Sequence, residues 1–121
     1  MAGIATILLV YPDDMVARLL AAVLSDAGYR VQIAVDGPSA LRAITTCPPA
    51  LVLLDLLLPG MSGYEVLARL RRADAPTLPV VVISANLATQ DLLTQGANAV
   101  LIKPVAFADL LACVAAHIAA G

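Results

Sequence analysis

Charged and aromatic residues are scarce in this sequence. Charged residues make up 13% of the 121 positions, aromatic residues make up 3%, and tryptophan is absent. The formal net charge of −2 leaves no excess of basic side chains to hold nucleic-acid phosphates, so we expect no nucleic acid binding by this domain. Although 61% of the residues are hydrophobic, acidic residues and a histidine interrupt the longest apolar runs. None reaches the roughly 18 residues that a membrane-spanning helix needs, and we expect no membrane contact.

Cysteine is also rare, with Cys47 and Cys113 the only two. They lack the paired spacing of a metal site, and we expect free thiols, buried or partly buried, in the reducing cytoplasm. No charged segment followed by an apolar one opens the chain, so no secretory signal is expected. Length and composition together predict one compact domain over residues 1–121.

Short apolar segments alternate with amphipathic ones along the whole chain. Strands are predicted at 4–10, 30–35, 51–54, 80–83 and 99–102. Helices are predicted to follow them, beginning near Asp13, at a Ser39 cap, at Tyr64, at Leu87 and at Phe107. This alternation predicts an α/β flavodoxin-like (βα)5 fold, with a doubly wound parallel sheet of order 2-1-3-4-5 and helices on both faces.

Polar side chains stand at the predicted carboxyl ends of three strands. Asp55 follows the apolar run 51–54, Ser84 ends the next strand, and Lys103 ends the last. Because these ends meet at one edge of a parallel sheet, we expect the three side chains to lie together. Asp55 could then act as a nucleophile that forms an acyl phosphate, with Lys103 as counter-ion and Ser84 as a hydrogen-bond donor to the phosphoryl oxygens. The alternative is a structural ion pair between Asp55 and Lys103, with Ser84 as a turn residue.

Several motifs give the chain a specific resemblance. They are ILLV at 7–10, LLDLLLPGMSG at 53–63, PVVVISA at 79–85 and GANAVLIKP at 96–104. With these motifs the chain resembles the CheY-like receiver domains of two-component response regulators over nearly its whole length. The resemblance implies that Asp55 is the phosphoacceptor, that Ser84 holds the hydroxyl position, and that Lys103 is the invariant lysine. It also implies a cis bond between Lys103 and Pro104.

The sequence departs from the receiver pattern where the family binds Mg²⁺. Receivers carry an acidic pair directly after the first strand, and Tyr11 and Pro12 occupy those positions here. The remaining candidate metal ligands are the Asp55 carboxylate, the backbone carbonyl of Leu57, and Asp13, whose alternative role is to cap the first helix. We therefore predict that Mg²⁺ binding is weak.

The positions that transmit the signal in this family also differ. Valine stands at the two aromatic positions, Val100 and Val105, and the short 84–96 segment predicts a short or irregular fourth helix. Two hypotheses follow: a receiver still phosphorylated at Asp55, or a pseudo-receiver that serves as a docking or dimerisation module without phosphate. Both predict a sensor histidine kinase or another signalling protein as partner, and a possible homodimer through the face of the fourth helix, fifth strand and last helix.

Enzyme activity beyond chemistry at Asp55 is not expected. Phosphatases of the haloacid dehalogenase type need a second aspartate where Leu57 stands. The loop after the first strand is acidic and would repel the phosphate of a flavin. A basic cluster formed by Arg69, Arg71 and Arg72 is interpreted as a solvated helix end, with a partner surface as the alternative, and His117 as a partly exposed surface residue.

Overall fold

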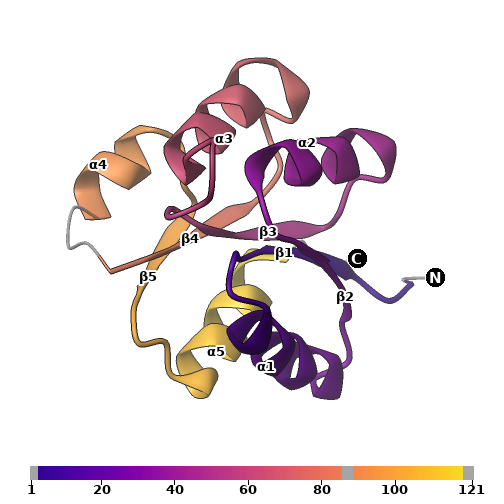
Figure 1. The fold of residues 1–121 in the computed structure, drawn as a ribbon. Helices are drawn as coiled ribbons and strands as arrows, with labels where there is room; N and C mark the ends of the chain where they lie inside the picture. Colours follow the sequence, from indigo (N-terminus) through magenta and orange to yellow (C-terminus); the bar gives the residue numbers. More distant parts are fainter. Residues whose placement is uncertain (1–2, 86–88, 119–121) are drawn as a thin grey trace.

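The chain forms a five-stranded parallel sheet between two layers of helices (Figure 1). The computed structural model describes residues 3–85 and 89–118. The strands are β1 (Thr6–Val10), β2 (Arg30–Ala34), β3 (Leu51–Asp55), β4 (Val80–Ser84) and β5 (Ala99–Ile102). The helices are α1 (Asp14–Asp26), α2 (Gly37–Thr46), α3 (Gly63–Arg69), α4 (Thr89–Thr94) and α5 (Phe107–His117). The strand order is β2-β1-β3-β4-β5, which confirms the predicted topology.

Two apolar layers hold the helices against the sheet. Helices α2, α3 and α4 cover one face, and α1 and α5 cover the other (Figure 1). Successive strand side chains point to opposite faces, so Val52 and Leu54 of β3 belong to the first layer while Leu51 and Leu53 belong to the second. Every residue of β3 and β4 is buried, as the continuous apolar runs predicted.

Side-chain caps begin the first two helices. An Asp13 carboxylate oxygen accepts hydrogen bonds from the backbone N–H groups of Met15 at 3.0 Å and Val16 at 3.2 Å. The predicted Ser39 cap of α2 is wrong, because Asp36 caps that helix and accepts from the Ser39 N–H at 2.8 Å. Hydrogen bonds from the side chain and backbone of Ser39 hold the pKa of Asp36 below its usual value.

Three segments in the second half of the chain depart from regular helix-and-loop geometry. A π-helical turn, Leu70–Asp74, continues α3, and α4 is short, as predicted. The predicted start of that helix at Leu87 lies outside the described residues. The peptide bond between Lys103 and Pro104 is cis, as the resemblance implied. Across residues 3–85 and 89–118, every helix is too short or too polar to cross a membrane.

Candidate functional site

A buried ion pair lies at the carboxyl end of β3. Asp55 is 2% exposed, and the Lys103 ammonium donates to both of its carboxylate oxygens, at 3.1 and 3.0 Å. The backbone N–H of Leu57 donates a further hydrogen bond to one of these oxygens at 3.1 Å. A buried carboxylate is costly without such partners, and Lys103 supplies the cation that the sequence predicted.

Ser84 lies beside this pair, at the end of the neighbouring strand β4. It is buried, and together with Asp55 it borders a pocket of about 220 Å³. The other residues around this pocket are Leu56, Leu57, Ser62, Tyr64 and Ala85. The structure thus brings the three predicted strand-end residues to one sheet edge, where Asp55 and Ser84 border a pocket large enough for a small group.

Gly63 allows the loop after β3 to fold back beneath Asp55. Its N–H donates to the Leu56 carbonyl at 3.0 Å. A Cβ atom at position 63 would lie 2.6 Å from both the Asp55 carbonyl oxygen and the Leu56 Cα, which is closer than real side chains approach backbone. Glycine is therefore required where the loop turns into α3, directly beside the backbone of Asp55.

The described residues offer Mg²⁺ a poor set of ligands. The Asp55 oxygens already bind Lys103 and the Leu57 N–H, and Asp13 caps α1, which was the alternative role predicted for it. Within residues 3–85 and 89–118, no three or more His, Cys, Asp or Glu side chains are grouped to hold a metal ion. Mg²⁺ favours several oxygen ligands in octahedral geometry, so one carboxylate and the carbonyl of Leu57 fit it badly. Metal binding by Asp13 stays a prediction.

Tyr11 contributes to the site in a way that the sequence analysis did not predict. Its side chain is buried, and the ring centroid lies 5.2 Å from the Lys103 ammonium, within range of a cation–π interaction. The Tyr11 N–H donates to the Ala34 carbonyl at 3.0 Å and so extends the pairing of β1 with β2. The ring therefore packs on the lysine from the position where the resemblance implies an acid.

The prediction of a solvated basic cluster is wrong for Arg71. Its guanidinium donates to the Gly96 carbonyl at 2.8 Å, to the Asn98 side-chain oxygen at 2.9 Å and to the Ala75 carbonyl at 3.1 Å. Partial burial lowers the pKa of Arg71. The side chain thus joins the end of α3 to the turn before β5, whereas the side chains of its two basic neighbours are exposed.

Other predictions concern single residues away from the ion pair. His117 is partly exposed, as predicted, and its Nδ1 lies 2.7 Å from the Cys113 carbonyl oxygen. Both cysteines are free; Cys113 is half-buried, and burial raises its thiol pKa, but Cys47 is exposed, contrary to the prediction. Val100 packs partly buried against the α2–α3–α4 layer.

Comparison with known proteins assigns the family. The sequence model of one protein family, the response regulator receiver domain, matches residues 7–115. The chain belongs to this family. The receiver fold and the Lys103–Asp55 contact at its sheet edge agree with that assignment.

Curated relatives and solved structures agree with the assignment. The uncharacterized transcriptional regulatory protein YkoG of Bacillus subtilis is 41% identical over 109 residues, which cover 88% of this chain and 47% of YkoG. The DNA-binding response regulator MtrA of Mycobacterium tuberculosis is 39% identical over 115 residues, which cover 93% of this chain and 50% of MtrA. This receiver thus spans about half the length of these relatives. A crystal structure of a putative response regulator from Chloroflexus aurantiacus has a TM-score of 0.91 and 34% identity, and the match covers 98% of this chain and 100% of that one.

Proposed function

We propose that this receiver accepts a phosphoryl group on Asp55, binds Mg²⁺ weakly, and passes its state on through protein contacts. The observation that carries the proposal is the contact of Lys103 with both Asp55 oxygens beside a pocket that Ser84 borders. A purely structural ion pair would not need an open pocket next to its carboxylate. The family as a whole serves two-component signalling, with no catalysis beyond the chemistry of the aspartate.

The proposed donor is the phosphohistidine of a sensor histidine kinase. An Asp55 carboxylate oxygen attacks phosphorus, an O–P bond forms, and the N–P bond breaks with its electron pair going to the imidazole nitrogen. The Lys103 ammonium offsets the charge that arrives with the phosphoryl oxygens, and the Ser84 hydroxyl donates a hydrogen bond to one of them. These roles use only groups that the structure places at the carboxyl edge of the sheet.

A docking module that works without phosphate is the second candidate function. It is favoured by the poor ligand set for Mg²⁺, in which Asp13 is used as a helix cap. It is also favoured by Val100, which stands where the resemblance implies an aromatic switch residue. A half-buried valine on β5 can respond to changes at Ser84 only by small packing shifts.

The proposed partners follow from the same domain surface. Besides the kinase, we propose a homodimer through α4, β5 and α5, where all four residues of β5 are only half-buried. Because the curated relatives are about twice as long, any output activity of a full-length protein is itself a proposal. With a net charge of −2, this domain is not proposed to contact DNA. Its two free thiols suit the cytoplasm, where we propose that it works.

The decisive experiment follows intact mass during incubation with acetyl phosphate and Mg²⁺. We expect the wild type to gain the mass of one phosphoryl group, more slowly than a receiver with the full acidic pair. Asp55→Asn is the matched control and gains none. If the wild type also gains none at millimolar Mg²⁺, while the reference receiver is labelled, phosphorylation is refuted and the docking module stands.

A second variant tests the assigned cause of weak metal binding. Tyr11→Asp combined with Pro12→Asp restores acids at the positions that follow β1. We expect this variant to bind Mg²⁺ more tightly and to be labelled faster than the wild type, since it adds two oxygen ligands of the kind that Mg²⁺ prefers. Circular dichroism serves to check that the variant is folded. A wild type that already binds Mg²⁺ as tightly as the reference receiver would refute the assigned cause.

A further inference from the structure

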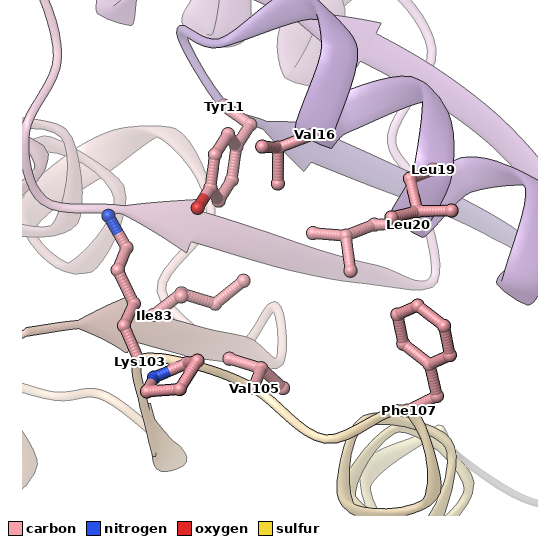
Figure 2. Close-up of a pocket in the computed structure, with 9 residues that line it drawn as sticks. Tyr11, Val16, Leu19, Leu20, Ile83, Lys103, Val105 and Phe107 are labelled. Atoms are coloured by element: carbon pink, nitrogen blue, oxygen red, sulfur yellow. The ribbon is translucent and has the colours of Figure 1, made fainter.

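A second, larger pocket opens on the other face of the sheet, between α1 and the turn from β5 to α5. Figure 2 shows the side chains around it. They are Tyr11, Val16, Leu19, Leu20, Ile83, Lys103, Pro104, Val105 and Phe107. Its volume of about 440 Å³ lies in the range of small-molecule sites, which are mostly apolar with a few polar groups that orient the ligand. This composition matches such a site.

The polar groups gather at one end of this pocket. In Figure 2 the Lys103 ammonium and the Tyr11 hydroxyl lie toward one side, and the Phe107 ring lies at the far side. Asp55 is 2% exposed and does not border this pocket, so a molecule inside it meets the positive member of the ion pair. An ammonium group has three N–H donors, and Lys103 directs two contacts to Asp55. One donor therefore remains for another acceptor.

The apolar end of the pocket is open to solvent. The Leu19 side chain on α1 is 53% exposed, and Phe107 at the start of α5 is 44% exposed. Leu20, behind them, is buried. A hydrocarbon or aryl group that fills this end would cover the exposed apolar surface of both Leu19 and Phe107 and remove it from water.

We propose that this pocket binds a small amphipathic carboxylate with an aryl or alkyl tail. The carboxylate accepts hydrogen bonds from the Lys103 ammonium and the Tyr11 hydroxyl, and the tail lies between α1 and Phe107. The charge presented by Lys103 selects an anionic head, because a cationic head would face a like charge without reaching the buried Asp55. The binding does not require phosphorylation of Asp55.

Sharing Lys103 couples this pocket to Asp55. In the Asp55→Asn variant the lysine loses its charged partner, so its full charge is available to the ligand, and we expect affinity for the carboxylate to rise. A phosphoryl group on Asp55 adds negative charge beside Lys103, and we expect it to lower that affinity. The coupling is reciprocal, so an occupied pocket disfavours the phosphorylated form by the same factor.

The test uses two probes of the same tail and opposite charge, 4-phenylbutyrate and 4-phenylbutylamine. Titration of the ¹⁵N-labelled protein, followed by amide chemical shifts, gives both the affinity and the location of binding. We expect 4-phenylbutyrate to shift the amides of Leu19, Leu20, Val105 and Phe107 in a saturable way, and the amine to leave them unchanged. Equal binding of both probes, no saturation up to about 20 mM, or shifts centred elsewhere would overturn the proposal.

Matched variants on α1 test whether the pocket itself is responsible. Leu19→Glu places a negative charge at the pocket rim, while Met15→Glu places the same charge one helical turn away, on an 81% exposed residue that does not border the pocket. We expect Leu19→Glu to weaken 4-phenylbutyrate binding by about fivefold or more and Met15→Glu by less than about twofold, because exposed charges are screened by salt. Asp55→Asn should strengthen binding. Equal losses in the two glutamate variants, or no gain in Asp55→Asn, would refute the assigned site.

Discussion

Replacing Lys103 by methionine removes the counter-ion from a carboxylate that is almost completely buried. Lys103 donates to both oxygens of Asp55, and the Leu57 N–H donates to one of them. Methionine keeps most of the length and the apolar stem of lysine. The variant therefore isolates the loss of charge and of its hydrogen bonds.

The expected cost follows from the burial of the two partners. Removing one member of a fully buried pair costs about 3–5 kcal/mol. Because 26% of the Lys103 side chain is exposed, and because Asp55 keeps the Leu57 hydrogen bond, we expect about 2 kcal/mol for Lys103→Met. Asp55→Asn should cost about 1 kcal/mol or less, since the freed lysine can turn toward water. The double variant should be about as stable as Asp55→Asn, because asparagine needs no counter-ion.

Urea unfolding followed by far-UV circular dichroism measures these free energies. The control is Arg18→Met, which breaks an exposed pair with Asp14 whose side chains are 76% and 68% exposed and should cost less than about 0.5 kcal/mol. A Lys103→Met variant as stable as the Arg18→Met control would refute the reasoning. A double variant that is less stable than Lys103→Met would refute it too, because Asp55→Asn should remove the unpaired buried charge that Lys103→Met leaves.

Three further predictions use the same unfolding assay. Gly63→Ala should lose about 2–4 kcal/mol because its Cβ would meet backbone atoms at 2.6 Å. Gly37→Ala should lose less, since its Cβ would meet only side-chain atoms of Met61, at 2.9 Å, and equal losses would contradict this. Arg71→Lys should lose about 1–2 kcal/mol, because an ammonium cannot reproduce the fork of hydrogen bonds to the turn before β5, and an unchanged stability would contradict this. The pKa of Asp36 lies below its usual 3.8 because of the hydrogen bonds from Ser39, so its stabilisation is present above that value and lost as pH falls through the folded-state pKa. The stability advantage of the wild type over Asp36→Asn should therefore shrink in acid, and an advantage that grows would be the wrong sign.

Local patterns predicted the sheet and the residues at its edge. The apolar runs of β3 and β4 and the short connections determined the topology, and the topology brought Asp55, Ser84 and Lys103 together. The contacts of Arg71 could not be predicted in this way, because its partners Gly96 and Asn98 lie 25 and 27 positions later in the chain. The local sequence pattern of an arginine that follows an amphipathic helix is the same whether its guanidinium group is solvated or donates hydrogen bonds to a distant turn.

The packing of Tyr11 on Lys103 shows a similar limit. The sequence revealed that an acid was missing after β1, but not that the aromatic ring in its place would lie 5.2 Å from the lysine. That distance depends on how β1 and β5, which flank β3 and β4, present their ends to one edge. The presence of Tyr11 in place of an acid therefore predicted the loss of a metal ligand, but it did not predict the contact of the ring with Lys103.

The charge at the site leads to a last prediction. Asp55 and Lys103 together carry no net charge, whereas acids at Tyr11 and Pro12 would add two negative charges that a cation must offset before an anionic phosphodonor can approach. A donor therefore meets less repulsion here without Mg²⁺, although transfer lacks the stabilisation that a metal gives to the moving oxygens. We expect labelling of the wild type by acetyl phosphate to be slow and to change by less than about threefold between EDTA and millimolar Mg²⁺, because weak binding of Mg²⁺ limits its effect. The variant with both aspartates restored should need Mg²⁺. A wild-type rate that rises steeply with Mg²⁺ would show that the metal is bound and used despite Tyr11 and Pro12.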